Sequence, residues 1–402
     1  MGKPKIRFEG YSEDWEQRKL DDVLKRRIEQ RQQSEEYPRL AFASGQGVIP
    51  LSERKTNNRE QLTKDEYTKK YLVTELNDIV YNPANVKYGA IDRNKCGRGV
   101  ISPIYVTFTT NEVPGFIERI VTSHDFQQRA LRFEEGTVTK RQSVNPEDLV
   151  TLDILVAPKR EEQQKIATYF DALDHLITLH QRKYDETKTL KKYMLQKMFP
   201  QNGEKVPEIR FDGFTEDWEQ RKLGDNIVEY TEKTTENNQY PVLTSSRKGI
   251  FFQTDYYDGN QIASADNTGY NIVPYGYFTY RHMSDDEIFH FNINDIAENG
   301  IVSTLYPVFT TDENLDSRYL QYQLNYGREF ARYAILQKQG GSRTYMYLNK
   351  LRNLYLTVPT AIEEQKKISE YFTNLDHLIT LHQRKCNELK EIKKYMLQNM
   401  FV

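Results

Sequence analysis

Residues 161–199 read EEQQKIATYFDALDHLITLHQRKYDETKTLKKYMLQKMF. The stretch contains no proline or glycine, and most of its residues favour helices. Apolar side chains and one histidine recur at alternating steps of four and three residues, which is a coiled-coil period. The positions of this stripe are Ile166, Phe170, Leu173, Ile177 and His180. The pattern predicts one continuous helix of roughly 58 Å, ending before Pro200.

A second copy of this helix closes the chain. Residues 363–401 read EEQKKISEYFTNLDHLITLHQRKCNELKEIKKYMLQNMF, and 28 of the 39 positions are identical to the first copy. The corresponding stripe is Ile368, Phe372, Leu375, Ile379 and His382. Because two helices of equal length present equal stripes, we expect them to pack antiparallel as a spacer between two globular units.

A shorter signature is also duplicated. Residues 4–22 and 207–225 share 14 of 19 positions, and each copy carries one of the two tryptophans, Trp15 and Trp218. We expect each Trp to anchor a short helical turn. The chain is therefore a tandem repeat of a domain, not a solenoid. The expected segments are a first globular domain at 1–158, a helix at 159–201, a second globular domain at 202–360 and a helix at 361–402.

The two globular domains share a framework but differ in sequence. GVISPIYVTF at 99–108 corresponds to GIVSTLYPVF at 300–309. Short β-branched and aromatic runs between turn residues predict strands at 78–82, 100–109 and 275–281, and helices at 118–132 and 318–336. The expected fold class is α+β, with each domain a mixed α/β unit on a mostly antiparallel, curved sheet. Identical helices with diverged domains suit a protein that reads two unlike targets at a fixed separation.

Composition limits the possible classes of protein. The chain has 402 residues, 38% of them hydrophobic and 28% charged, with a formal net charge of −2. Two cysteines are too few for a disulfide framework. No apolar run approaches the roughly 20 residues that span a bilayer, and the first residues lack the apolar core of a signal peptide. We expect a soluble, cytoplasmic protein without a membrane partner.

The repeated motifs resemble those of a known family. The duplicated DWEQRKL, the paired G-x-x-S-x-x-Y segments and the helices ending KKYMLQ-x-MF resemble the specificity subunit of type I restriction–modification enzymes. The resemblance covers essentially the whole chain. It implies that each globular domain is a target-recognition domain reading half of a split sequence in double-stranded DNA, and that the helices form the spacer and recruit two modification subunits.

The resemblance also implies a division of chemistry. The subunit itself would be non-catalytic and free of cofactors. S-adenosylmethionine would belong to the adenine-methylating modification subunits, and ATP and magnesium to restriction subunits that join them. The residues agree, since the sequence has no G-x-x-x-x-G-K-[ST] phosphate loop and no N-P-P-[YF] motif. The nearest match, Asn82-Pro83-Ala84-Asn85, departs from that motif after the proline.

Basic and polar residues in predicted loops are the candidates for DNA contact, because such side chains pair with base edges or phosphates. In the first domain the candidates are Lys87, Tyr88, Arg93, Lys95, Arg98, Lys140, Arg141 and Gln142. In the second domain they are Ser246, Arg247, Lys248, Arg281, His282, Ser342 and Arg343. For each group the alternative is an ordinary solvated turn. The loops at 136–142 and 340–343 both place arginine after glycine, which favours the functional interpretation.

The charge of the second domain argues against simple electrostatic binding. Residues 23–148 hold 20 basic and 17 acidic residues, whereas residues 226–349 hold 9 basic and 15 acidic residues. A domain with a net charge of −6 is repelled by phosphates. We therefore expect the isolated chain to bind DNA weakly, with partner subunits supplying much of the positive surface.

Several alternatives remain open at this level. His175 and His180 are five residues apart, which does not place them on one helix face, so packing is favoured over metal binding. The apolar helix ends around Phe199 suit either a partner or the repeat signature of the same chain. The acidic second domain also suits a two-armed protein scaffold that does not touch nucleic acid, and a stand-alone enzyme is the weakest reading.

Overall fold

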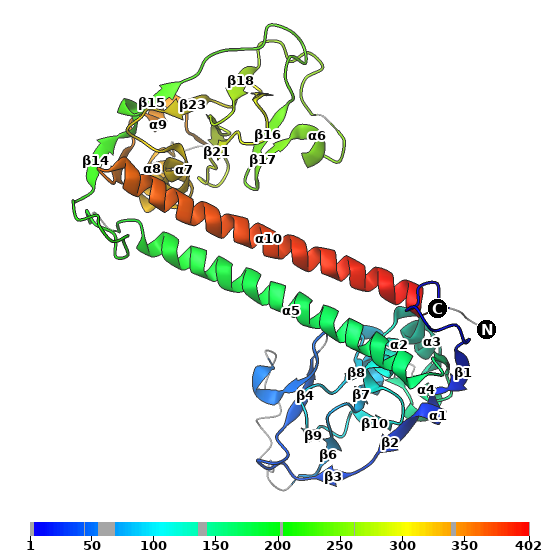
Figure 1. Cartoon of the computed structure of the whole chain (residues 1–402). Helices are drawn as coiled ribbons and strands as arrows, with labels where there is room; N and C mark the ends of the chain where they lie inside the picture. The colour runs from blue at the N-terminus through cyan, green and yellow to red at the C-terminus, as the bar shows by residue number, and fades with distance from the viewer. Residues whose placement is uncertain are drawn as a thin grey trace. The chain divides into compact units, whose positions relative to one another are not determined.

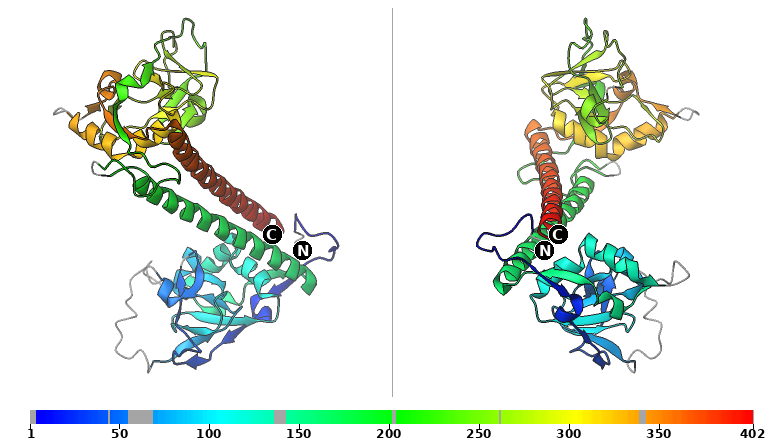
Figure 2. Two further views of the ribbon diagram at one scale, coloured as in Figure 1. Left: turned by 60° about the vertical axis from the view of Figure 1, so that its left-hand side comes forward. Right: turned by 90° about the vertical axis from the view of Figure 1, so that its right-hand side faces the viewer.

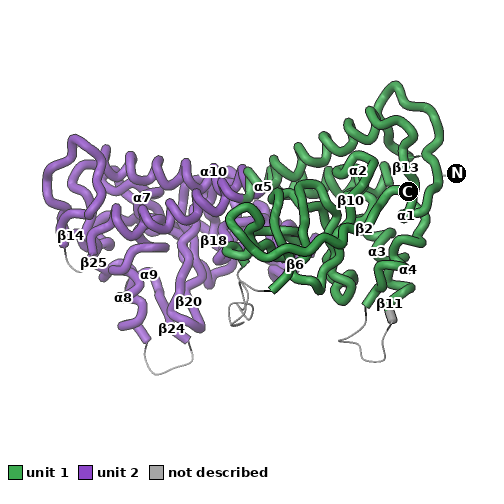
Figure 3. Tube along the Cα trace, turned by 90° about the horizontal axis from the view of Figure 1, so that it is seen from below, with its two compact units in different colours: residues 1–181, 384–402 green, residues 182–383 purple. Residues whose placement is uncertain are grey.

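The computed structural model describes residues 4–43, 45–54, 69–135, 143–201, 204–260, 262–338 and 343–401 (Figure 1). The chain forms two compact units, which are coloured separately in Figure 3. The first unit comprises residues 1–181 and 384–402, and the second comprises residues 182–383. Each unit therefore contains part of both long helices, one part from each repeat of the sequence.

Two long helices, α5 (Arg160–Lys197) and α10 (Ile362–Met400), match the predicted helices to within two residues at each end. In the first unit Asp174 pairs with Lys393, and the Cys386 thiol lies 3.9 Å from the Ile177 carbonyl oxygen. In the second unit Lys191 Nζ lies 2.6 Å from Asp376. Position 174 of α5 therefore lies beside position 393 of α10, whereas position 191 lies beside position 376. The two helices run in opposite directions, so the predicted antiparallel packing is confirmed (Figure 2).

The first unit is built from small antiparallel sheets. The central sheet has the order β2 (Leu24–Arg27), β10 (Val106–Thr110), β7 (Ile79–Tyr81), β8 (Ile91–Arg93). The remaining strands are β3 (Gln30–Arg31), β6 (Tyr71–Thr74) and β9 (Gly99–Ile101) in one sheet, and the pairs β4 (Leu40–Ala43) with β5 (Gly47–Pro50), β11 (Glu134–Glu135) with β12 (Ser143–Val144), and β1 (Glu16–Lys19) with β13 (Asp153–Val156). The short helices are α1 (Leu20–Val23), η1 (Leu51–Glu53), η3 (Pro83–Tyr88), α2 (Pro114–Val121), α3 (His124–Ala130), η4 (Leu131–Phe133) and α4 (Pro146–Leu149).

The second unit repeats this plan. Its central sheet has the order β15 (Ile227–Glu229), β23 (Val308–Thr311), β19 (Phe278–Thr279), β21 (Asn292–Ile293). The paired strands are β14 (Glu219–Lys222) with β25 (Tyr355–Val358), β16 (Leu243–Ser246) with β17 (Gly249–Phe252), β18 (Asn271–Pro274) with β22 (Asn299–Val302), and β20 (Met283–Ser284) with β24 (Thr344–Tyr345). The short helices are η6 (Leu223–Asp225), α6 (Gln253–Tyr256), α7 (Ser317–Tyr326), α8 (Arg328–Leu336) and α9 (Leu348–Leu351). The predicted tandem α+β fold is confirmed.

Three local predictions differ from the structure. The helix expected at 318–336 is broken at Gly327, where a Cβ atom would lie 2.3 Å from the Gln323 carbonyl oxygen. The helix expected at 118–132 is divided at Ser123, which caps α3 by accepting a hydrogen bond from the Phe126 N–H. The helical turn expected at Trp15 comes later, as α1, because residues 16–19 form strand β1 and pair with β13.

The repeat signature fastens the base of each long helix. Arg7 donates two hydrogen bonds, of 2.6 and 2.8 Å, to the buried Glu162, and Trp15 Nε1 donates a third at 3.3 Å. The second unit repeats all three at the same lengths with Arg210, Trp218 and Glu364. The Arg and Trp that bind each buried carboxylate lie about 150 residues before it in the sequence. Because a buried carboxylate is costly without such partners, the duplicated signature has a structural role in both units.

The first three positions of each helix stripe are buried in the core of a globular domain. Ile166, Phe170 and Leu173 belong to the core of the first unit, and Ile368, Phe372 and Leu375 belong to the core of the second. The later positions, Ile177, His180, Ile379 and His382, are half-buried. The N-terminal half of each stripe therefore packs into the core of a globular domain, and the rest of the stripe is only half-buried.

The apolar helix ends are covered by the chain itself. Met198 and Phe199 are buried in the second unit, where the Phe199 ring packs on Trp218, Tyr319 and Phe372. Phe401 packs in the same way on Trp15, Phe116 and Phe170 of the first unit. Both tryptophans are thus structural anchors. None of the described helices combines the length and the apolar character that a membrane span requires.

Candidate nucleic-acid interface

A cleft in the second unit brings together three of the predicted DNA-contact residues. The cleft has a volume of about 210 Å³ and is lined by Ser246, Arg247 and Arg281 together with Tyr256 and Tyr257. Ser246 ends strand β16, and Arg247 and Lys248 form the exposed turn to β17. Arg281 precedes β20 and is exposed, and it forms no salt bridge within the part of the chain that the structure describes. Residues far apart in the sequence thus form one tyrosine-rich, arginine-bearing surface.

Acidic neighbours balance part of this positive charge. Arg247 pairs with Asp286, and the hydrogen bond from that guanidinium lowers the pKa of the Asp286 carboxyl group. Arg343 Nε lies 2.8 Å from Asp285 across the β20–β24 ribbon. These arginines are about half exposed. A phosphate would therefore compete with a carboxylate for each of them, which is an exchange of exposed ion pairs and costs little.

His282 is not available as a base-reading side chain. It is 6% exposed, its ring Nδ1 bonds to the Leu305 carbonyl oxygen, and Tyr347 stacks on it with ring centroids 4.7 Å apart. The prediction that His282 contacts DNA is corrected on this ground. Its position beside Arg281 made it a candidate, but Arg281 is exposed whereas the His282 ring is buried beneath Tyr347.

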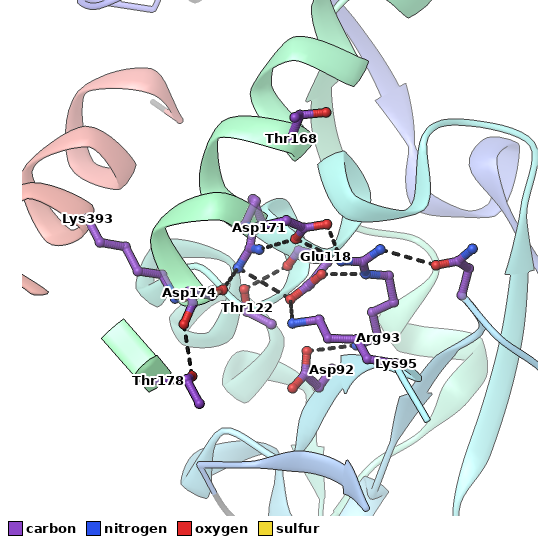
Figure 4. A network of polar contacts seen from close by, with 12 residues as sticks. Asp92, Arg93, Lys95, Glu118, Thr122, Thr168, Asp171, Asp174, Thr178 and Lys393 are labelled. Atoms are coloured by element: carbon purple, nitrogen blue, oxygen red, sulfur yellow. Dashed lines mark hydrogen bonds and ion pairs between the residues drawn. The ribbon is translucent and has the colours of Figure 1, made fainter. Parts of the chain in front are cut away.

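Arg93 is the second correction, because its guanidinium joins the first domain to helix α5. Arg93 Nε lies 2.6 Å from Glu118, and Nη2 lies 2.7 Å from Asp171. Only 12% of the side chain is exposed. Figure 4 shows the network, in which Arg93 and Lys95 converge on Glu118 from β8 and the turn that follows it. The network holds Arg93 in place, so it is not free to read a base edge.

The same network lines a larger cleft of about 870 Å³ between the first domain and α5. Arg119 bridges Asp171 and Asp174, and Lys393 pairs with Asp174 from the opposite helix. Burial acts to raise the pKa of the Asp174 carboxyl group, but Arg119 and Lys393 outweigh it and lower the pKa. Asp92 has no such cation in contact, and burial together with the charge of Glu118 raises its pKa to about 6. Ion pairs in this cleft thus connect the first globular domain to α5.

The remaining candidates in the first domain divide into exposed and undescribed positions. Lys95 is about half exposed although it pairs with Glu118 at 2.6 Å. Arg98 pairs with Glu36 and Glu75 and is also about half exposed. Tyr88 is 64% exposed at the end of η3. The residues Lys140, Arg141, Gln142 and Ser342, and the side chain of Lys87, lie outside the described part of the structure.

Corresponding residues build the framework of both domains. Tyr81 donates a hydrogen bond to the Val144 carbonyl oxygen at 3.2 Å, and Tyr280 donates one to the Met346 carbonyl oxygen at 2.8 Å. Asn94 and Asn294 are both fully buried, and the side-chain amide of each donates to a backbone carbonyl three residues later. The domains thus share a frame and differ in the side chains that they present from it.

Tyrosines on the surface of the second domain were missed in the sequence. Tyr256 and Tyr257 line the smaller cleft, and Tyr345 and Tyr347 stand exposed beside Arg343. The run RTYMY at 343–347 carried a signal, because a short run of Thr and aromatic residues is typical of a strand. Among the described residues, no group of three or more His, Cys, Asp or Glu side chains could hold a metal ion.

Comparison with known proteins explains this architecture. The family model described as the type I restriction modification DNA specificity domain matches residues 215–391, and the first repeat carries the same signature and helix. The crystal structure of the S subunit of the type I restriction-modification system from M. genitalium matches with a TM-score of 0.59. It is 13% identical, and the match covers 100% of this chain and 99% of that one. The second repeat of the chain thus matches the type I restriction modification DNA specificity domain, and the whole chain has the fold of that S subunit.

The HsdS subunit from Thermoanaerobacter tengcongensis is also similar, with 16% identity, 97% of both chains covered and a TM-score of 0.41. No curated protein sequence matches this chain significantly.

Proposed function

We propose that this chain recognises a bipartite site in double-stranded DNA, with each globular domain reading one half. The duplicated frame with diverged surfaces supports the proposal. The clamp of Trp, Arg and Glu recurs with the same three hydrogen-bond lengths in both units. The outward surfaces share little, since the second unit presents tyrosines and arginines where the first presents other residues. Two domains with the same framework and different surfaces suit a DNA site whose two halves differ in sequence.

The partners follow from the family. Two modification subunits with S-adenosylmethionine would methylate adenine in each half-site, and restriction subunits with ATP and magnesium would join them in the cytoplasm. Exposed apolar side chains along the long helices, including Leu176 and Leu378 at equivalent positions, offer a surface for these subunits. The net charge of −6 over residues 226–349 makes the partners a necessary part of the DNA-binding surface.

Adenine-methylation mapping tests the proposal. Genomic DNA from cells that express the modification subunit with and without this chain is sequenced for N6-methyladenine. We expect methylation at one split motif that disappears without the chain. A chain that recovers the modification subunit in a pull-down but leaves the methylation pattern unchanged would be a protein scaffold, and the proposed function would be wrong.

The spacer is tested separately by lengthening both helices. Two heptads inserted into α5 and two into α10 add about 21 Å to each, with the insertions placed in the exposed middle of each helix. We expect the same two half-sequences with a longer gap between them. An unchanged gap would show that the helices do not set the spacing.

A further inference from the structure

Residues 343–347 present a ladder of one arginine and two tyrosines on one side of an extended segment. Arg343, Tyr345 and Tyr347 are exposed, whereas Thr344 and Met346 between them are buried. Alternate residues of a strand point to the same side, so the three exposed side chains form one row. We call Arg343, Tyr345 and Tyr347 the tyrosine ladder.

The rings of the ladder are stacked and held in place. Tyr345 and Tyr347 lie with ring centroids 5.8 Å apart and planes at 11°, and Tyr347 covers the buried His282 ring at 4.7 Å. The Met346 N–H donates to the His282 carbonyl oxygen at 2.7 Å, and the Tyr280 hydroxyl donates to the Met346 carbonyl oxygen. The buried residue between the two tyrosines is thus fixed at both backbone groups, which pre-organises the exposed rings.

Both tyrosine rings of the ladder are accessible to solvent. Tyr345 is 37% exposed and Tyr347 is 47% exposed, although both sit on a well-fastened ribbon. Stacking on His282 requires only one face of Tyr347. Arg343 forms a side-chain hydrogen bond with Tyr345, which places a guanidinium group directly beside the first ring of the ladder.

Cations flank the tyrosines without forming a strongly positive patch. Arg343 pairs with Asp285 on the opposite strand, and Arg281 lies two residues before β20. Arg281, Met283 and Asp285 line or border the 210 Å³ cleft described above, so the ladder and the cleft form one continuous surface. The surface offers planar rings, hydroxyl groups and two guanidinium groups, a set that suits sugar, base edges and phosphate.

The first unit has the same frame but no ladder. Because Val144 and Met346 receive equivalent tyrosine hydrogen bonds, Ser143 corresponds to Tyr345 and Asn145 corresponds to Tyr347. Short polar side chains therefore occupy the places of the two rings. The framework therefore does not require aromatic residues at these positions. We conclude that the two rings contact a ligand of the second unit that the first unit does not share.

We propose that the tyrosine ladder is the DNA-contacting edge of the second unit and determines the half-sequence that this unit reads. Tyr345 and Tyr347 contact base edges and sugars, and Arg343 and Arg281 contact phosphates. The partner subunits supply the positive field that this acidic domain lacks, and the ring and hydroxyl contacts add discrimination between base sequences. This inference rests on the proposed function, since it names the residues that perform one half of the recognition.

Substitution of the ladder tests the inference in the assembled complex. The variants are Tyr345→Ala, Tyr347→Ala and the double variant, each co-purified with the modification subunit. Tyr355→Ala is the matched control, because Tyr355 is 52% exposed in the same unit but lies on β25, which pairs with β14. The probe is a labelled duplex carrying the mapped motif, with further duplexes changed in only one half-site, measured by fluorescence anisotropy.

We expect the double variant to bind the mapped duplex at least about 10-fold more weakly, and to lose discrimination between correct and changed bases in one half-site only. The control should bind as the unchanged chain does. Methylation mapping of the same variants should show one relaxed half-sequence and one unchanged half-sequence.

Equal affinity and an unchanged motif in the double variant would overturn the inference while leaving the proposed function intact. A chain without any motif-dependent methylation would overturn the proposed function instead. If removal of the Tyr347 ring unfolds the unit by uncovering His282, Tyr347→Phe and Tyr345→Ala retain that cover and decide the question.

Discussion

Removal of one aromatic ring at the end of the chain should destabilise the domain at its beginning. Phe401 follows α10 directly, yet its ring lies 5.7 Å from Trp15, 5.7 Å from Phe116 and 6.1 Å from Phe170 between ring centroids. All three partners are at most 3% exposed. The substitution Phe401→Ala therefore leaves a cavity beside the core of the first unit, almost 400 residues away in sequence.

The size of the effect follows from the burial. Replacing a fully buried phenylalanine by alanine costs about 3–5 kcal/mol, and Phe401 is only partly buried, so we expect about 3 kcal/mol. Because 1.4 kcal/mol corresponds to a factor of 10, the opening equilibrium of the first unit should rise about 100-fold. The second unit should keep its stability, since its equivalent ring is Phe199.

Hydrogen exchange followed by mass spectrometry measures both units in one experiment. Peptides from β10 and α2 should lose protection in Phe401→Ala, and peptides from β23 and α7 should not. Phe199→Ala should give the reverse pattern. Tyr395→Ala is the control, because Tyr395 is 59% exposed near the same helix end and its loss should cost less than about 0.5 kcal/mol. If Phe401→Ala only frays the last turn of α10, the docking of the helix end contributes no stability and the reasoning fails.

Two further substitutions test the joint between the first domain and α5. Arg93→Ala should lower the stability of the first unit by about 1–2 kcal/mol, because it removes one of the two arginines that pair with both Glu118 and Asp171, while the methylated motif stays the same. Arg98→Ala, about half exposed, should change stability by less than about 1 kcal/mol, and a changed motif in Arg93→Ala alone would contradict the structural role. Asp92→Asn should raise the stability of the first unit by up to about 3 kcal/mol at pH 8 and change it little at pH 4. The native pKa of Asp92 is raised to about 6, so its ionisation costs stability as the pH rises from about 4 to 6. Denaturant titrations at both pH values measure this, and equal stability of the two proteins at pH 8 would refute it.

The helices and the tandem plan could be predicted because their signals are local or repeated. A stripe of period 3.5 needs only the sequence of the helix itself, and duplication is visible without any structure. The signature was placed correctly as a structural element, but its strand could not be predicted. Residues 16–19 become β1 only because β13, more than 130 residues later, pairs with them.

The exposure of the candidate DNA-contact residues was predicted less well, because exposure depends on partners that are distant in sequence. Arg93 had only Asp92 as an acidic neighbour in its loop, yet it is held by Glu118 and Asp171, which are 25 and 78 residues away. A count of basic residues in a loop therefore overestimates how many of them are free to contact a ligand. A search for basic residues selects Arg343 and passes over the exposed tyrosines beside it. In a domain with a net charge of −6, the better guide is alternation within an extended segment, which shows that Tyr345 and Tyr347 face solvent whatever the charge around them.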